Sequence, residues 1–184
     1  MMTLETWCDE LRTFHIPKWD ELPDFELYMD QVITYIEKHL KVLSSEQNKL
    51  ITQAMINNYV KLKLMPAPIK KRYAKKHLAF LIAITILKQV ITISEIKDGI
   101  QYLFILHGEK KAYDFFCEEQ ERALQSVLQA PVQQQVQKQE PLEHMAMRMA
   151  AISFANKIMA EKMISLQREF LNQHSSKKKG SKGS

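Results

Sequence analysis

Apolar side chains recur at steps of three and four residues along most of the chain, and this spacing constrains the fold more than any other feature. Near the N-terminus, Leu4, Trp7, Cys8, Leu11 and Phe14 follow it. Such spacing places one apolar stripe on an α-helix, whereas a half-buried strand would alternate with a period of two. Glycine, which weakens helices, occurs only 4 times in 184 residues. The sequence therefore predicts an all-α fold.

The chain before residue 49 is expected to contain two helices. Pro17 and Pro23 bracket a loop after the first helix, and we expect Trp19 in that loop to pack onto the core. Asp24 is the expected N-cap of the second helix, which runs to about residue 40, and residues 44–48 form a polar turn. The expected buried stripe of the second helix consists of Leu27, Tyr28, Val32, Ile33, Ile36 and Leu40.

A short helix with two different faces is expected to begin at Thr52, whose hydroxyl can cap it. Pro66 and Pro68 end this helix, and the basic residues 69–73 are expected to be extended. The apolar residues 74–90 should form the most buried helix. The inner face of the short helix consists of Met55, Ile56, Tyr59, Val60 and Leu62, and its outer face of Gln53, Asn57, Asn58 and Lys61.

Two further helices are expected before residue 130. Thr92 and Glu95 have the spacing of a capping box, which starts a helix through about residue 106. Gly108 marks the end of that helix, and residues 109–128 form the next one. The inward side chains of the first of these helices are Ile93, Ile96, Ile100, Leu103 and Phe104.

The C-terminal part is expected to hold a heptad helix over residues 142–173, after a Gln- and Pro-containing linker at 131–141 and before a disordered basic tail at 174–184. The a/d seam consists of Leu142, Met145, Met149, Ile152, Asn156, Met159, Met163, Leu166 and Phe170. A coiled coil with this spacing predicts a homodimer, and the buried Asn156 can fix its register. A helix packed on its own domain, or against another protein, is the alternative.

Charge is segregated along the chain. Residues 1–30 carry eight acidic side chains against two basic ones, whereas residues 47–94 carry no acidic side chain. A solvated helical surface interleaves both signs, so the second window predicts a surface for a polyanion. Its nine bases are Lys49, Lys61, Lys63, Lys70, Lys71, Arg72, Lys75, Lys76 and Lys88.

Double-stranded DNA is the polyanion that fits the order of these elements. A helix enters the major groove, where Gln and Asn side chains can bond adenine, and flanking bases contact phosphates. The residues expected at the DNA are Thr52, Gln53, Asn57, Asn58, Lys61, Lys63, Lys70, Lys71, Arg72, Lys75 and Lys76. The alternative is a non-enzymatic adaptor that has a degenerate helix-turn-helix and binds a partner protein through its C-terminal helix.

Four short motifs resemble those of MerR-type regulators. They are MINNY at 55–59, KLMPAP at 63–68, KRY at 71–73 and TISEI at 92–96. Asn57 stands where those regulators have a phosphate-contacting arginine, and Lys63 and Val90 stand in place of glycines. The resemblance implies a MerR-like winged helix-turn-helix with a short wing over residues 1–107, a connecting helix over 109–130 and a dimeric transcriptional regulator.

The segments LYMDQVI at 27–33 and MINNYVK at 55–61 are also similar to the Firmicute family called domain of unknown function 1836. That similarity covers about residues 7–106 and implies a MerR-like regulator without an established ligand. It adds Tyr59 and Tyr73 to the expected DNA-binding residues, together with Arg72, as phosphate contacts or the supports of such contacts.

Catalysis, metal binding and membrane insertion are not expected. Cys8 and Cys117 lie far apart without partners at metal-ligand spacing, so we expect two buried apolar side chains in a reducing compartment. His39 and His77 each have lysine neighbours and are expected to be solvated. The longest apolar run, residues 78–87, is too short to span a bilayer. The chain is therefore expected to be a cytoplasmic, non-enzymatic protein without cofactors.

Overall fold

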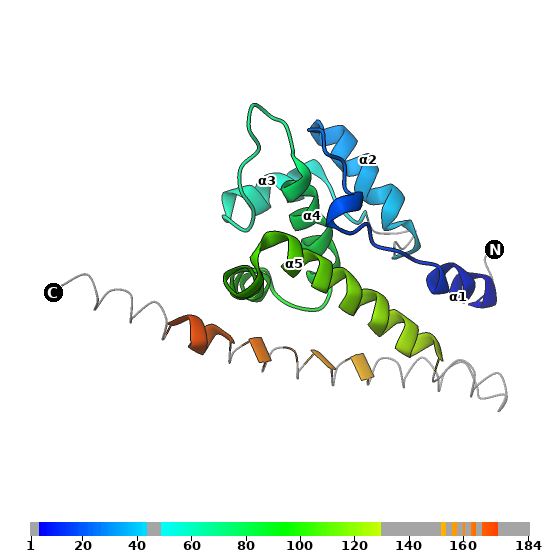
Figure 1. Ribbon diagram of the computed structural model, residues 1–184. Helices are drawn as coiled ribbons and strands as arrows, with labels where there is room; N and C mark the ends of the chain where they lie inside the picture. The colour runs from blue at the N-terminus through cyan, green and yellow to red at the C-terminus, as the bar shows by residue number, and fades with distance from the viewer. Residues whose placement is uncertain are drawn as a thin grey trace. The chain divides into compact units, whose positions relative to one another are not determined.

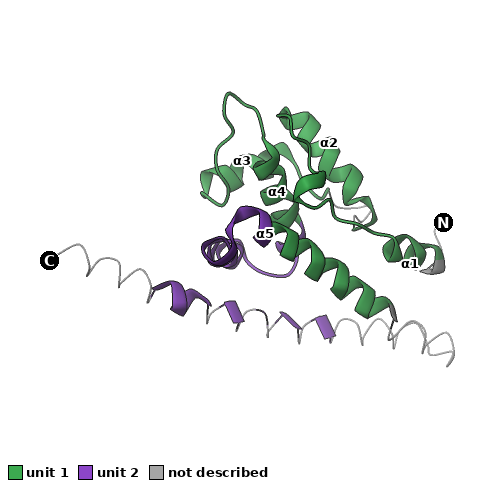
Figure 2. Cartoon of the chain, viewed as in Figure 1, with its two compact units in different colours: residues 1–85, 113–140 green, residues 86–112, 141–184 purple. Residues whose placement is uncertain are grey.

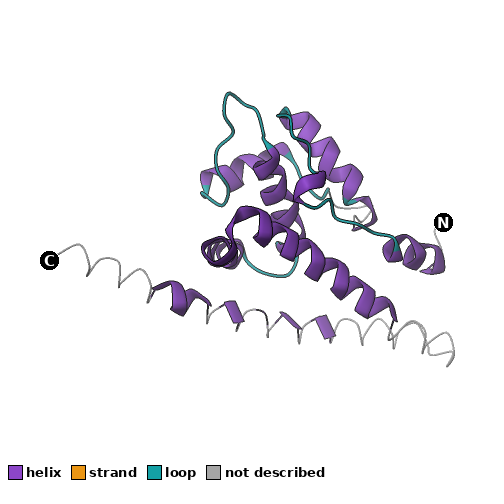
Figure 3. Cartoon of the chain, in the orientation of Figure 1, coloured by secondary structure: helices purple, strands orange, loops and turns teal. Residues whose placement is uncertain are grey.

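The computed structural model describes residues 4–43, 49–129, 152–153, 156–157, 160, 163–164 and 167–172. Its elements are α1 (Leu4–Arg12), the 3-10 turn η1 (Trp19–Glu21), α2 (Met29–His39), the 3-10 turn η2 (Lys41–Leu43), α3 (Gln53–Lys61), α4 (Lys75–Leu87) and α5 (Ile93–Gln129) (Figures 1 and 3). Within the described ranges there is no strand, only isolated bridges at Leu27–Tyr73 and Ile69–Arg72. The prediction of an all-α fold is confirmed.

The chain divides into two compact units (Figure 2). Unit 1 comprises residues 1–85 and 113–140, and unit 2 comprises residues 86–112 and 141–184. Helix α5 contributes to both units. Gly108 interrupts it with a non-helical backbone (φ 76°, ψ 168°), which confirms the predicted helix end at this glycine. The Thr92–Glu95 capping box before α5 is also confirmed, because the Thr92 N–H donates to the Glu95 carboxylate at 2.8 Å.

Helix α4 is the centre of the core of unit 1. Eight of its 13 residues are buried, because the helix carries apolar side chains on all of its faces. Residues 75–87 therefore form the buried helix that the sequence predicts. His77 is one of the eight and is 1% exposed, so the expectation that it is solvated was wrong. His39 is half-buried and stacks on Tyr35 with ring centroids 4.1 Å apart.

Helix α2 begins later than predicted, and Asp24 does not cap it. The backbone of Leu27 exchanges two hydrogen bonds with that of Tyr73, which keeps this segment extended up to the N-cap residue Tyr28. Tyr28 is 48% exposed rather than buried, and Ile33 is half-buried. The other members of the predicted stripe are buried: Leu27, Val32, Ile36 and Leu40.

The connection between α2 and α3 runs from residue 40 to residue 52. This is longer than the three- or four-residue turn of most helix-turn-helix motifs. The predicted polar turn at 44–48, the linker at 131–141 and the tail at 174–184 lie outside the described residues. No described helix is long and apolar enough to cross a membrane.

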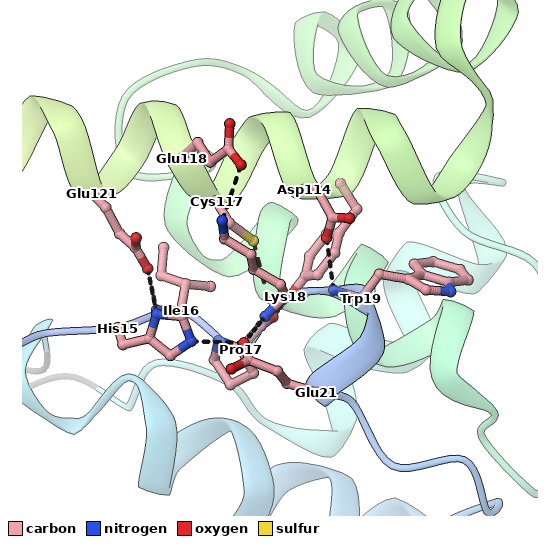
Figure 4. Close-up of polar contacts among 11 residues, drawn as sticks. His15, Ile16, Pro17, Lys18, Trp19, Glu21, Asp114, Cys117, Glu118 and Glu121 are labelled. Carbon is pink, nitrogen blue, oxygen red and sulfur yellow. Dashed lines mark hydrogen bonds and ion pairs between the residues drawn. The ribbon is translucent and has the colours of Figure 1, made fainter.

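The segment from Arg12 to Trp19 lies along the second half of α5, and together they form a contact that we call the clasp (Figure 4). Side chains at helical spacing on α5 bind main-chain groups of this segment. The bonds join Glu121 to Ile16 N (2.8 Å), Asp114 to Trp19 N (2.7 Å), Tyr113 OH to Pro17 O (2.8 Å) and Gln125 to Arg12 O (2.8 Å). The partners lie about a hundred residues apart, so they close unit 1.

The charged side chains of the clasp are paired within it. Lys18 lies 2.9 Å from Glu118, and the two ring nitrogens of His15 lie 2.7 Å from Glu21 and 2.9 Å from Glu121. The backbone N–H of Lys18 and the imidazole of His15 lower the pKa of Glu21. The carboxylates of the clasp therefore all have a hydrogen-bond or ion-pair partner within it.

The clasp is continued by an apolar cluster that joins α1 to the end of α5. Cys8, Leu11 and Leu128 are buried there, and Leu124 packs against them. Cys117 is also buried and free, and burial raises the pKa of its thiol to about 12. Both cysteines are therefore buried, as predicted. Trp19 is half-buried, with its ring edge against Tyr113.

Candidate nucleic-acid interface

Helix α3 presents a polar face to solvent, because its opposite face is anchored in the core. Thr52 caps the helix as predicted, with its hydroxyl accepting from Met55 N at 3.2 Å. Ile56 and Tyr59 are 0% and 4% exposed and hold the helix in place. The exposed face consists of Gln53, Asn57, Asn58 and Lys61, as predicted.

A left-handed residue that is not glycine ends α3. Lys63 has φ 54°, and its N–H donates to Val60 O at 3.0 Å. The N–H of Leu64 reaches Tyr59 O at 3.0 Å, which completes a Schellman motif. The motif turns the Lys63 side chain to solvent and buries Leu64. Leu62, predicted to face the core, is 46% exposed because the helix has already ended.

Residues 69–72 form a tight turn, which we call the basic turn, rather than the extended segment predicted from the sequence. Lys70 and Lys71 both have positive φ, 48° and 62°, and Arg72 N donates to Ile69 O at 2.9 Å. This is the pattern of a type I′ hairpin turn, which Asn and Gly usually occupy. Both lysines are exposed at its tip.

The base of the basic turn is fixed against the segment before α2. Tyr73 and Leu27 exchange backbone hydrogen bonds of 2.8 and 2.9 Å. At the residues next to this pair, the Arg72 guanidinium lies over the Tyr28 ring, with its Cζ 4.6 Å from the ring centroid. Such cation–π contacts stabilise by about 0.5–1 kcal/mol at exposed sites and orient the cation. Tyr28 therefore lies on this exposed surface beside Arg72, whereas the sequence placed it in the core.

The predicted cations are not equally available to a ligand. Lys61, Lys63, Lys70, Lys71 and Arg72 are exposed, and none of them is paired with a carboxylate of the described part of the chain. Lys75, by contrast, pairs with Asp24, and its side chain is only 19% exposed. Lys76 is half-buried, and burial lowers the pKa of Lys88.

Tyr59 and Tyr73 support the exposed residues from within the core. Their side chains are 4% and 3% exposed, and burial raises the pKa of both hydroxyls. Of the two roles implied by their family resemblance, phosphate contact or support, their burial fits support. Tyr59 anchors α3, and Tyr73 holds the end of the basic turn.

The C-terminal seam is described only in part. Ile152, Asn156 and Met163 are helical and exposed. Phe170 meets the edge of the Tyr102 ring at 5.4 Å. Beside it, Arg168 pairs with Asp98 at 2.7 Å, so residues 168–170 pack on the helix of their own unit. The remaining seam residues lie outside the described residues: Leu142, Met145, Met149, Met159 and Leu166.

Among the described residues, no group of three or more His, Cys, Asp or Glu side chains has the geometry to hold a metal ion. The acidic side chains that do gather, in the clasp, are occupied by main-chain N–H groups and by His15 and Lys18. The exposed cations of α3 and the basic turn, by contrast, have no carboxylate partner in the described part of the chain.

Comparison with known protein families shows to which family the chain belongs. The model of a family described as "Domain of unknown function (DUF1836)" matches residues 17–116, which is more than half of the chain. The chain belongs to this family. No curated protein and no solved structure shows a significant match to it.

The DUF1836 domain contains the whole of α3 and the basic turn. The apolar cluster that continues the clasp lies outside it on both sides, since α1 precedes residue 17 and Leu128 follows residue 116. The segments that precede and follow the DUF1836 domain thus pack on each other in this cluster.

Proposed function

We propose that the chain is a DNA-binding transcriptional regulator that docks the exposed face of α3 in the major groove and the basic turn on phosphates. The observation that carries this proposal is a set of exposed cations, Lys61, Lys63, Lys70, Lys71 and Arg72, without carboxylate partners in the described chain. Phosphates are the partners that such cations bind on duplex DNA.

Base recognition falls to the amides of α3 in this proposal. Gln53 and Asn57 lie four residues apart and therefore share one face of the helix, with Asn58 beside them. An amide can bond adenine N6 and N7 together, which discriminates against a wrong base by about 1–3 kcal/mol. The fixed backbone of α3, capped by Thr52 and anchored by Ile56, suits a helix that must hold these amides in register.

The arrangement that we propose is a MerR-like winged helix-turn-helix. Helix α2 takes the first position, α3 the recognition position and the basic turn that of a short wing. The pairing of Tyr73 with Leu27 supports it, because it ties the turn to the start of α2. The long α2–α3 connection is a departure from the usual motif.

A salt-titrated selection on random duplex DNA tests the proposal, with a triple variant in which Lys70, Lys71 and Arg72 become Gln. We expect enrichment of one sequence by the unmodified protein, and a slope of log affinity against log salt that is less steep by about 3 in the variant. The matched control changes Lys38, Lys97 and Lys111 to Gln, three exposed lysines that belong neither to α3 nor to the basic turn, and should leave the slope nearly unchanged. An equal decrease of the salt slope in both triple variants would show that the protein binds DNA only by unspecific charge. Absence of DNA binding at low salt would overturn the proposal.

We also propose that the regulator is a homodimer joined through the C-terminal helix. Exposed Ile152 and Met163, at 42% and 48%, support it because large apolar side chains on a helix favour a covering partner. The molar mass in solution, from light scattering, tests it. A monomer at micromolar concentration, or a stoichiometric complex with a different protein and no duplex binding, would favour the adaptor function instead.

A further inference from the structure

The loop that carries the basic turn is closed by one buried side chain of α4. His77 is 1% exposed, and its ring lies between two main-chain groups of this loop. Ala74 N donates to its Nδ1 at 2.9 Å, and its Nε2 lies 3.3 Å from Ala67 O. Ala67 and Ala74 bracket the loop, so one imidazole joins the two ends of the segment between them.

Both hydrogen bonds require one particular proton arrangement. Because Nδ1 accepts from the Ala74 N–H, it carries no proton. The neutral ring then has its proton on Nε2, which donates to Ala67 O. The neutral ring in this tautomer satisfies both partners, whereas the doubly protonated ring would direct an N–H at the N–H of Ala74.

The loop needs such a closure, because its tip has an unfavourable backbone. Non-glycine residues in the left-handed region cost about 1 kcal/mol or more each and persist where surrounding contacts impose them. Lys70 and Lys71 are two such residues in succession. Tyr73, which ends the turn, also meets the His77 ring edge to face with centroids 5.7 Å apart.

The surroundings of the ring favour its neutral form. Burial lowers the pKa of His77, and the charge of Lys76 on α4 acts in the same direction. Glu26, from the segment before α2, and the Ala67 carbonyl act in the opposite direction, and Tyr73 faces the ring as a neutral phenol. A histidine with a lowered folded-state pKa stabilises the fold above its ordinary pKa, and this contribution is lost as the pH falls through the folded value.

We propose that His77 is a positioning residue that keeps the basic turn in its DNA-binding shape only while its ring is neutral. The inference rests on the proposed DNA binding and adds a pH response to it. Acid should weaken duplex binding through the turn, although an extra positive charge alone would strengthen it. The sign of the pH effect therefore separates a positioning role from simple electrostatics.

The test compares the unmodified protein with His77→Gln and His77→Leu between pH 5 and pH 8. Glutamine can accept from Ala74 N and donate to Ala67 O without titrating, whereas leucine can do neither. We expect His77→Gln to bind duplex DNA within about threefold of the unmodified protein at pH 8 and to exceed it severalfold at the acid end of the range, and His77→Leu to be weak throughout.

A measurement without DNA keeps this test separate from the proposed function. Amide hydrogen exchange at Arg72 and Ala74, corrected for intrinsic rate, should accelerate on acidification in the unmodified protein but not in His77→Gln. If exchange behaves so and no DNA binds, the DNA proposal fails and the positioning role stands. The same pH response in both proteins, or NMR evidence for a proton on Nδ1 at pH 8, would overturn the inference.

Discussion

The clasp and the basic turn use charge in opposite ways. In the clasp, Glu118 pairs with Lys18, and Glu121 contacts His15 and accepts from the main-chain N–H of Ile16. In the basic turn, Lys70 and Lys71 face solvent on a left-handed backbone, without carboxylates of the described chain beside them. The clasp is complete in itself, whereas the turn combines an unfavourable backbone with uncompensated charge.

We expect the clasp to contribute to the stability of unit 1 and the basic turn to contribute to binding. Charges that are neutralised in place, like those of the clasp, hold the chain together. Cations that are held apart on a costly backbone are retained where an external anion gains from them. Substitutions in the clasp should therefore change the free energy of unfolding, and substitutions in the basic turn should change binding.

The largest effect is expected from truncation of a buried leucine in the apolar cluster that continues the clasp. Leu11→Ala removes a side chain that is 3% exposed and should lower the free energy of unfolding by about 2–5 kcal/mol. Duplex affinity, measured where the variant is folded, should stay within about twofold, because α1 packs on η2, and α3 packs on α2 rather than on α1. Urea unfolding and fluorescence anisotropy measure the two quantities.

A buried residue of α3 provides the matched control for this variant. Ile56→Ala should cost a similar free energy of unfolding, since Ile56 is 0% exposed, but it should also weaken duplex binding because it loosens α3. Equal losses of affinity in the two variants would show that the clasp and α3 act as one functional element, and the comparison would break down.

An intermediate effect is expected when the basic turn receives the residues that its backbone favours. The double variant Lys70→Asn, Lys71→Gly should raise the free energy of unfolding by about 1 kcal/mol, because Asn-Gly is the preferred type I′ pair. The same variant should bind DNA less tightly, with a salt slope reduced by about 2. A loss of stability would show that the two lysines make contacts which outweigh their backbone cost.

The smallest effect is expected at the end of α3. Lys63→Gly relieves a left-handed residue at φ 54° and should stabilise the protein by about 0.5–1 kcal/mol. Lys61→Gly removes the same charge from the last residue of the helix, where φ is not positive, and should destabilise the protein by up to about 1 kcal/mol. Thermal unfolding measures both, and a destabilised Lys63→Gly protein would refute the account of this helix end.

The features that the sequence predicted correctly are local ones. The Thr52 cap, the polar face of α3, the Thr92–Glu95 box and the break at Gly108 each depend on residues within one or two turns of each other. Their energies come from neighbours along the chain, so spacing alone reveals them. The segregation of cations was also visible without a structure.

The features that the sequence did not reveal depend on distant partners. Asp24 looks like a cap, but pairing of Leu27 with Tyr73 keeps its segment extended. His77 looks solvated because it follows Lys75 and Lys76, but α4 is buried on all sides and turns it inward. The basic turn carries no glycine or asparagine, so the usual signal of a type I′ turn is missing at Lys70 and Lys71.

The clasp also brings the two borders of the DUF1836 domain together. Ile16, the residue before the matched region, is bonded to Glu121, five residues beyond its end, at 2.8 Å. A domain whose two ends lie close together can be inserted into a loop of another protein with little distortion of the host. It can equally be permuted, with its natural ends joined by a short linker and new ends opened elsewhere on its surface.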